Sequence, residues 1–253
     1  MKNLEQNNPP QRVLVVFGTR PEAIKMAPVV KELQRRPEIQ PIVCVTAQHR
    51  AMLDQVLEVF QIKPDYDLDL MRQNQDLAGL TARILQEFTK VILEAKPDLV
   101  LVHGDTTTAM VAALAAFYQQ IPIGHVEAGL RTYDKYSPFP EEMNRQLIDC
   151  LADWLFAPTE RSKQNLLAKL NKGQKVVVTG NTAIDALKTT VSDSYQHPVL
   201  DWVGDNRMVL MTAHRRENWG EPMRHIFRAV NTLTECFPDL RVVYPVHLNP
   251  RVQ

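Results

Sequence analysis

Two acidic side chains stand where buried strands would end in this sequence. The apolar run IPIGHV (121–126) is followed directly by Glu127, and the run DLVLVH (98–103) is followed by Gly104 and Asp105. A bare carboxylate in an apolar interior costs on the order of several kcal/mol, so each of these groups must be solvated, paired or used. The two positions are therefore candidates for a functional site, beside the alternatives of solvation and ion pairing.

A histidine stands two residues before each of these acids, His103 before Asp105 and His125 before Glu127. Residues two apart on a strand share a face, so each pair could bind a metal ion together. The spacing is a weak signal, however, and buried histidines bonded to the backbone are commoner than metal ligands. We therefore predict structural histidines and no metal site.

Basic side chains surround the expected start of the first helix, in GTRPEAIK (18–25). Arg20 and Lys25 lie where backbone N–H groups and the helix dipole favour anions, so a phosphate-bearing ligand fits there. The alternative is a pair of solvated charges at a helix start. Thr19 and Glu22 have the spacing of a capping box. The sequence lacks GxxxxGK[ST] and has no GxGxxG after the first strand, which argues against a P-loop NTPase and a typical NAD site.

Further polar residues open a later helix, in SPFPEEMNRQLID (137–149). Glu141 and Arg145 are four residues apart and lie on one face of that helix. One interpretation is a functional carboxylate with a neighbouring cation, and the other is a helix-start acid in an intrahelical ion pair. His214, in HRREN, is either a functional residue or a structural histidine whose hydrogen bonds are satisfied within the protein.

These residues need a scaffold, and apolar runs alternate with helical patterns along the chain. The runs are continuously apolar, as in strands buried on both faces, and predict a parallel sheet with helices on both sides. We therefore predict a doubly wound α/β fold, whose ligands bind beyond the carboxyl ends of the strands. The predicted strands are 12–17, 41–46, 98–103, 121–126, 153–158 and 175–180.

A polar, proline-containing stretch then interrupts the pattern. We predict an N-terminal Rossmann-like domain over 1–182, a linker over 183–204, and the start of a C-terminal nucleotide-binding domain over 205–253. RMVLMTAH, a helical pattern and LRVVYPVH give this last part a second β-α-β unit. Because nothing after the unit would cover its sheet, we expect the second domain to be incomplete.

The composition is that of an ordinary globular protein, with 45% hydrophobic residues among 253. Twenty-nine basic residues balance twenty-nine acidic ones, which argues against a nucleic-acid-binding surface. The polar N-terminus and the absence of an apolar run of about 18 residues predict a cytoplasmic protein without a membrane span. Cys44, Cys150 and Cys236 stand in apolar contexts and are predicted to be buried free thiols.

Eight blocks of the sequence together resemble the bacterial non-hydrolysing UDP-N-acetylglucosamine 2-epimerases, in the order of that family and from Arg12 onward. The blocks are FGTRPEAIKMAP, TAQHRAMLDQVL, VHGDTTTAM, GHVEAGLRT, SPFPEEMNRQ, VTGNTAIDAL, TAHRREN and YPVHLNP. The resemblance implies the B-type glycosyltransferase architecture, in which two Rossmann-like domains face a cleft. Family members are longer than this chain, so it also implies a C-terminally truncated chain.

The resemblance further implies an isomerase of cell-surface polysaccharide biosynthesis that interconverts UDP-N-acetylglucosamine and UDP-N-acetylmannosamine, through UDP elimination and a 2-acetamidoglucal intermediate. It implies a homodimer and no cofactor. The implied catalytic residues, of which the first three supply acid, base and charge-stabilising carboxylates, are Asp105, Glu127, Glu141 and His214. The implied substrate-binding residues are Arg20, Lys25, Arg145 and His247. A second UDP-N-acetylglucosamine, bound as activator, would contact Gln48, His49 and Arg72.

Two other functions stay open. The chain could be an inactive sugar-nucleotide-binding fragment that has most of the catalytic side chains but not the second half of the nucleotide site. It could also be a hydrolysing epimerase that releases UDP and N-acetylmannosamine. Water access to the glucal decides between the two enzymes, and the sequence does not show it.

Overall fold

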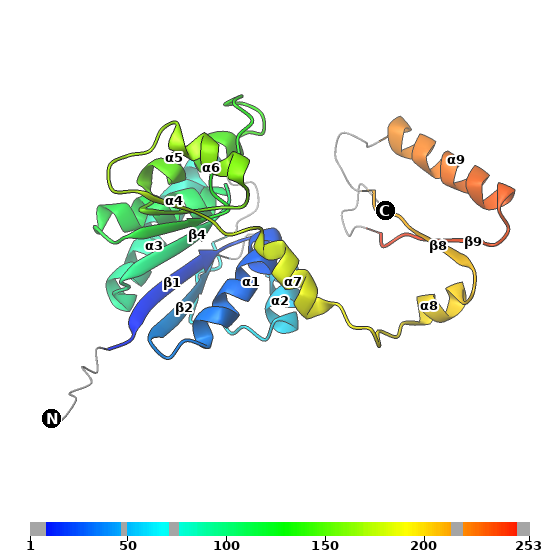
Figure 1. Cartoon of the computed structure of the whole chain (residues 1–253), viewed down its shortest axis with the longest axis horizontal. Coiled ribbons are helices and arrows are strands. Elements are labelled where there is room, and N and C mark those ends of the chain that lie inside the picture. Colours follow the sequence, from blue (N-terminus) through cyan, green and yellow to red (C-terminus); the bar gives the residue numbers. More distant parts are fainter. Residues whose placement is uncertain (1–8, 47–49, 71–75, 214–219, 247–253) are drawn as a thin grey trace. The chain divides into compact units, whose positions relative to one another are not determined.

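The computed structural model describes residues 9–46, 50–70, 76–213 and 220–246 of the chain (Figure 1). The chain divides into two compact units, residues 1–190 and residues 191–253. The boundary falls inside the segment 183–204 that was expected to be a linker. Two helices occupy the ends of that segment, α7 (Thr182–Thr190) and α8 (Pro198–Val203).

The first unit is built on a parallel sheet, which confirms the doubly wound fold predicted from the apolar runs. Within the described residues the sheet has seven strands in the order β3-β2-β1-β4-β5-β6-β7, and every neighbouring pair is parallel. The strand order reverses between β1 and β4, which is where ligands bind in open sheets of this kind. The strands are β1 (Gln11–Phe17), β2 (Ile39–Val45), β3 (Tyr66–Asp67), β4 (Leu99–His103), β5 (Ile123–Val126), β6 (Trp154–Ala157) and β7 (Lys175–Val178).

Helices cover both faces of this sheet and bury a separate apolar cluster on each. Val15 and Phe17 of β1 pack with residues of α1, α2 and α7, whereas Leu14 and Val16 pack with residues of α3, α4, α5 and α6. The continuous apolar runs are explained by this burial on both sides. The helices are α1 (Arg20–Gln34), α2 (Arg50–Val59), α3 (Leu77–Ala95), α4 (Thr107–Tyr118), α5 (Glu141–Leu151) and α6 (Glu160–Leu167).

The turn from β1 into α1 is fixed by a capping box, as predicted. Thr19 is the N-cap, its side chain accepts a hydrogen bond from the Glu22 N–H, and Glu22 accepts one from the Thr19 N–H at 2.8 Å. The preceding residue must be glycine, since a Cβ on Gly18 would lie 2.2 Å from Thr46 Oγ1 and 2.9 Å from Thr108 Oγ1. The turn therefore passes close against the neighbouring loops, which brings α1 near the end of β4.

The second unit contains the predicted β-α-β unit. In its described part, β8 (Arg207–Leu210) and β9 (Leu240–Val243) form a parallel pair that is connected through α9 (Glu221–Cys236). Neighbouring residues on β8 point to opposite faces, yet Met208 and Val209 are both exposed. Apolar side chains thus face solvent on both sides of this strand.

The cysteine prediction is wrong for two of the three positions. Cys44 is buried, and its burial raises the pKa of its thiol far above the usual value. Cys150 and Cys236 are exposed, because apolar neighbours in the sequence do not determine which side of a helix a residue occupies. Among the described residues, no helix has the length and apolar character needed to cross a membrane.

Candidate active site

Two of the three predicted acidic residues meet at the carboxyl ends of β4 and β5. Asp105 follows β4, Glu127 follows β5, and Lys25 and Arg145 reach them from α1 and α5. This position is beside the strand-order reversal between β1 and β4. The structure therefore assembles, at one edge of the sheet, two carboxylates and two cations that are far apart in the sequence.

Arg145 joins the two carboxylates. Its guanidinium donates to Asp105 Oδ2 and to the backbone carbonyl of Glu127, and lies 3.6 Å from Glu127 Oε1. Its side chain is only 6% exposed, whereas the Asp105 side chain is 33% exposed, so the arginine is buried and one of its partners reaches solvent. The alternative of an ion pair within the helix between Arg145 and Glu141 is wrong, because Arg145 points away from its own helix toward the strand ends.

Glu127 receives two further polar contacts on its other carboxylate oxygen. Lys25 Nζ lies 2.5 Å from Oε2, and the side-chain amide of Asn181 donates to the same oxygen at 3.4 Å. The Glu127 backbone has φ of +66°, a left-handed conformation that is costly for a residue with a Cβ. The backbone therefore turns abruptly out of the strand at the residue whose side chain enters the polar cluster.

The cations keep Glu127 ionised. Burial alone would raise its pKa, but His103, Lys25 and Arg145 together lower it below its usual value. Since His103 is itself neutral near pH 7, Lys25 and Arg145 are the partners that stabilise the anion at that pH. A carboxylate held in this form accepts a proton rather than donating one. Glu127 can therefore accept a proton in the structure as it stands.

His103 lies behind this carboxylate and is unusual for a buried polar side chain. It is 3% exposed, and neither ring nitrogen forms a hydrogen bond within the described part of the chain. The nearest polar contact is 3.8 Å from Nε2 to Glu127 Oε2, which is too long for a hydrogen bond. Burial lowers the pKa of His103 to about 3, against the opposing attraction of Glu127, so the ring is neutral.

His125 has the opposite environment, with a partner on each nitrogen. Nδ1 lies 2.6 Å from Asp149 Oδ1 and Nε2 lies 2.8 Å from the carbonyl oxygen of Gly104. Arg131 contacts the other oxygen of Asp149 at 2.6 Å. In the described ranges, no group of three or more histidine, cysteine, aspartate and glutamate side chains converges on a point that could hold a metal ion.

Glu22 connects the loop after β1 with the loop after β4. It accepts hydrogen bonds from the backbone of Gly18 and Thr19 through one oxygen, and from the Thr106 hydroxyl at 2.6 Å through the other. Burial raises the pKa of Glu22 even though these hydrogen bonds act to lower it. Thr106 is also the N-cap of α4 and follows Asp105 directly. The capping box of α1 thereby supports the loop that carries Asp105.

Other predicted residues are not drawn into this cluster. Glu141 is partly exposed in the first turn of α5, and Arg20 is exposed in the first turn of α1. Neither makes a hydrogen bond or an ion pair with another described residue. The remaining predicted site residues lie outside the described residues, and they are His214, His247, Gln48, His49 and Arg72.

Sequence reasoning missed several residues that hold the site together. Asn144 donates to the backbone carbonyl of Asp105 at 2.9 Å, and Asn181 contacts Glu127. Glu142 is 4% exposed and accepts from the backbone of Thr132 and Tyr133, so it anchors the segment that leads into α5. Asn181 could have been found, since it stands in the GNTAIDAL block of the resemblance. The contacts of Asn144 and Glu142 could not have been found in this way, because no local sequence pattern indicates them.

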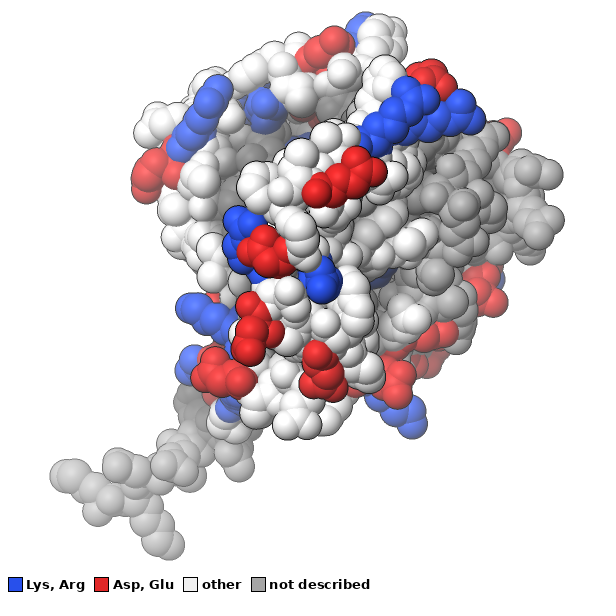
Figure 2. All heavy atoms as spheres, turned by 90° about the vertical axis from the view of Figure 1, so that its right-hand side faces the viewer, with Lys and Arg blue, Asp and Glu red and all other residues white. Residues whose placement is uncertain are grey.

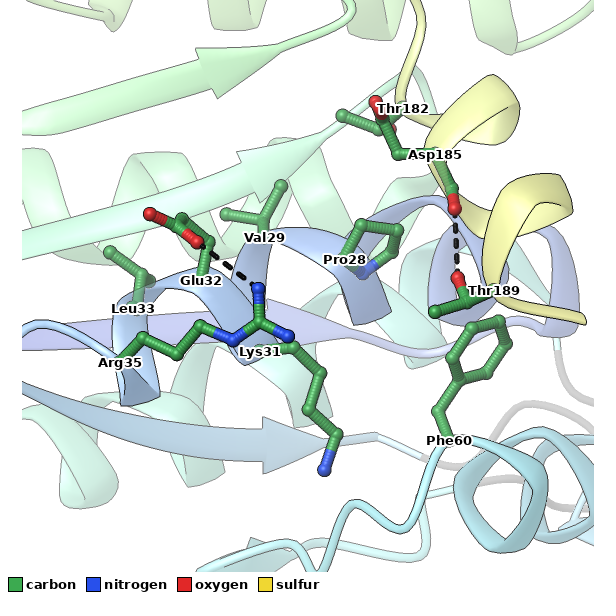
Figure 3. A pocket seen from close by; sticks show the side chains of 10 residues that line it. All are labelled: Pro28, Val29, Lys31, Glu32, Leu33, Arg35, Phe60, Thr182, Asp185 and Thr189. Atoms are coloured by element: carbon green, nitrogen blue, oxygen red, sulfur yellow. Dashed lines mark hydrogen bonds and ion pairs between the residues drawn. The ribbon is translucent and has the colours of Figure 1, made fainter.

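The main groove of the first unit lies away from this cluster. It has a volume of about 490 Å³ and runs between α1 and α7 (Figure 3). Arg35 and Glu32 on its wall are exposed and pair with each other at 3.7 Å. Asp105, Glu127 and Glu141 do not line it. Acidic and basic side chains are interspersed over the described atoms of the face drawn in Figure 2, in line with the balanced charge of the chain.

Comparisons with known proteins agree on one family. A family model described as UDP-N-acetylglucosamine 2-epimerase matches residues 31–253. A UDP-N-acetylglucosamine 2-epimerase of Bacillus subtilis is 60% identical over 242 residues, which cover 96% of this chain and 64% of that protein. The crystal structure of the Neisseria meningitidis UDP-GlcNAc 2-epimerase bound to UDP-GlcNAc is similar with a TM-score of 0.83 and 52% identity, over 96% of this chain and 67% of that one. That of Methanocaldococcus jannaschii in complex with UDP-GlcNAc and UDP has a TM-score of 0.77 and 33% identity, with the same coverage.

Proposed function

Because the chain belongs to the UDP-N-acetylglucosamine 2-epimerase family, we propose that it carries the acid–base half of an enzyme that interconverts UDP-N-acetylglucosamine and UDP-N-acetylmannosamine. The observation that carries the proposal is the Glu127 carboxylate, held ionised between Lys25 and Arg145 at a strand end. The chain spans 64% of the Bacillus subtilis relative, so the activity is proposed for the protein completed to the length of that relative.

The proposed chemistry follows from the substrate. The proton on C2 of the sugar is not adjacent to a carbonyl group and is not acidic, so it leaves as the C1–O bond to UDP breaks. The electron pair of the C2–H bond becomes the C1–C2 double bond of 2-acetamidoglucal, and the pair of the C1–O bond departs with UDP. Return of a proton to the other face of C2, with re-addition of UDP at C1, completes the inversion. Two faces require two proton-transfer groups.

The carboxylates divide these roles. Glu127 is proposed as the base, since it is ionised, and Asp105, which shares Arg145 with it, as the group that serves the opposite face or stabilises the positive charge at C1. Glu141 is proposed as the third carboxylate. It has no partner among the described residues to occupy it, which leaves its oxygens free for a ligand.

Lys25 couples diphosphate binding to the strength of the base. Its ammonium contacts Glu127 at 2.5 Å and belongs to the first helix after β1, where anions are favoured. A diphosphate near that helix start would draw the ammonium away from the carboxylate. Glu127 would then hold a proton more strongly when substrate is bound than when the site is empty.

Deuterium incorporation tests the proposal. Residues 1–253 are joined to the corresponding C-terminal third of the Bacillus subtilis relative, here named the extended protein, and incubated with UDP-N-acetylglucosamine in deuterated water. Deuterium at C2 of both sugars is expected, because the proton passes through carboxylates that exchange with solvent. Epimerised product that keeps all of its C2 hydrogen contradicts the proposed bases.

The same assay separates the alternative functions. Release of UDP with free N-acetylmannosamine indicates a hydrolysing enzyme instead of a non-hydrolysing one. We propose that residues 1–253 alone have no appreciable turnover, since the β8–β9 pair exposes apolar residues and two-stranded sheets are marginally stable. Turnover by these residues that equals turnover by the extended protein contradicts this.

Other parts of the function rest on the family resemblance. Substrate contacts from His214, His247 and Arg20, and an activator bound near Gln48, His49 and Arg72, stay predictions. So do the homodimer, the cytoplasmic location and the absence of a cofactor.

A further inference from the structure

His125 contacts both halves of the candidate site without belonging to the charged cluster. It is completely buried on β5, two residues before Glu127. One ring nitrogen meets Asp149, which lies on α5 one turn after Arg145. The other meets the carbonyl of Gly104, which directly precedes Asp105. The ring therefore lies between α5, which carries Arg145, and the loop that carries Asp105.

The protonation of this ring follows from its two partners. A carbonyl oxygen can only accept, so the Gly104 contact requires a proton on Nε2. The 2.6 Å contact between Nδ1 and Asp149 also requires a proton between them. A neutral imidazole has one N–H, so the second proton must come either from an imidazolium or from a protonated Asp149.

Arg131 decides between these two possibilities. Its guanidinium lies 2.6 Å from the second oxygen of Asp149, and both side chains are nearly buried, at 6% and 5% exposure. An arginine in that position stabilises the ionised carboxylate. Burial acts to raise the pKa of Asp149, and the Arg131 guanidinium acts to lower it. The proton therefore resides on Nδ1.

We propose that His125 is an imidazolium near neutral pH and acts as a positioning residue, which fixes the Gly104–Asp105 peptide to α5 through Asp149. A hydrogen bond donated by a charged group is stronger than one from a neutral ring. This bond restrains the backbone just before Asp105, while Asn144 of α5 restrains the carbonyl of Asp105 itself. The carbonyl oxygens of Gly104 and Asp105 are thus both restrained by side chains on the face of the sheet that α5 covers.

Gly104 explains why such a restraint is useful. It has φ of +69°, where the chain turns out of β4, and as a glycine it has the greatest backbone freedom of any residue. Without a fixed carbonyl the turn could rotate and move the Asp105 carboxylate away from Arg145. Misplacement of a reacting group by about 1 Å costs about 100-fold in rate.

The charge state is tested on the 253-residue chain, independently of any activity. In ¹⁵N-histidine NMR, assigned with a His125→Asn variant, both ring nitrogens of His125 are expected to carry protons near neutral pH. His103 is the matched control, since it is also buried at a strand end and its low pKa predicts one protonated and one bare nitrogen. A bare nitrogen on His125 overturns the imidazolium.

The positioning role rests on the proposed function and is tested by kinetics of the extended protein. Asp149→Asn removes the charge partner, and we expect kcat to fall by about 10- to 100-fold with a smaller change in KM, and Asp149→Glu to recover part of the loss. Asp153→Asn is the control, because Asp153 bonds the backbone of Ile123 at the other end of β5 and should alter melting temperature without altering kcat. An unchanged kcat in folded Asp149→Asn overturns the role. If the unsubstituted extended protein is inactive, the proposed function fails, while the NMR result still decides the charge state.

Discussion

The ends of β4 and β5 have the same sequence pattern, histidine followed two residues later by an acid, and different chemistry. At the end of β5, His125 has both ring nitrogens bonded, to Asp149 and to Gly104. At the end of β4, His103 has neither nitrogen bonded within the described residues and is neutral. Two buried histidines on neighbouring strands thus differ in proton count by their surroundings alone.

The difference comes from the face of the sheet that each ring occupies. In the parallel register His125 pairs with Val102, on the face covered by α3, α4 and α5, whereas His103 pairs with Val126, on the face covered by α1, α2 and α7. The first face offers the carboxylate of Asp149. The second offers the ammonium of Lys25, which is directed to Glu127. A shift of one residue along the strand therefore exchanges a carboxylate that bonds the ring for one that is already paired with a lysine.

The largest expected effect concerns the acid after β5. In the extended protein, Glu127→Gln is expected to lower kcat by about 10²- to 10⁴-fold with little change in KM, because the amide keeps the shape and loses the proton transfer. Steady-state kinetics beside calorimetric substrate binding measure this. Glu160→Gln, at an exposed position on α6, is the control. Near-normal turnover with a lower melting temperature would make Glu127 a structural residue.

The next largest effect is expected from removal of Arg145, which contacts the acids after both strands. Arg145→Met leaves Asp105 without its cation, and Glu127 retains only Lys25 as a bonded cation. We expect the free energy of unfolding to fall by about 3 kcal/mol, since removal of one member of a buried ion pair leaves charge uncompensated. Urea unfolding measures it. Arg207→Met, which breaks an exposed pair with Asp239 in the second unit, should cost less than about 1 kcal/mol. Equal losses would mean that the central pair is as weak as the exposed one.

A pH series tests the protonation of His103. The pKa of His103 falls from 6.5 in the unfolded chain to about 3 in the folded protein. Above the unfolded value the ring is neutral in both states. As the pH falls from 6.5 toward 3, the unfolded chain takes up a proton that the folded protein does not, so stability is lost at up to about 1.4 kcal/mol per pH unit.

His103→Gln should therefore flatten the decline in stability below pH 6.5, measured by urea unfolding at several pH values. A slope in His103→Gln that equals that of the unsubstituted protein would show that His103 is protonated in the folded state.

The smallest effect concerns the support of Asp105 by the adjacent helix. Thr106→Ala removes the N-cap of α4 and the contact to Glu22, and should cost about 1 kcal/mol of stability. Thr159→Ala removes the matching N-cap of α6 and should cost a similar amount. In the extended protein, kcat should fall in the first variant and stay constant in the second. A constant kcat in both would mean that the loop is positioned without Thr106.

Much of the fold could be predicted because it depends on local patterns. The continuous apolar runs identify strands that both faces bury, and the spacing of Thr19 and Glu22 identifies the start of α1. Asp105 and Glu127 could be located at the strand ends, because parallel strands deliver their following residues to one edge.

The partners of these residues could not be predicted, since they come from other elements. Four-residue spacing suggested that Arg145 meets Glu141, but the helix presents its guanidinium to Asp105 and Glu127. The sequence pattern is identical for His103 and His125, and the residues that face each ring are set by strand register. Exposure of Cys150 likewise depends on the rotation of α5 about its axis.

The left-handed backbone of Glu127 sets a conformational cost against a side-chain gain at one position. A left-handed conformation costs a residue with a Cβ about 1 to 2 kcal/mol, which glycine does not lose, and asparagine tolerates it better than glutamate does. The carboxylate offsets this cost through its contacts with Lys25 and Arg145, because removal of one member of a buried ion pair costs about 3 kcal/mol. Glycine or asparagine at position 127 would relieve the backbone and leave Lys25 without its ion partner, so selection for heat resistance alone would still retain glutamate.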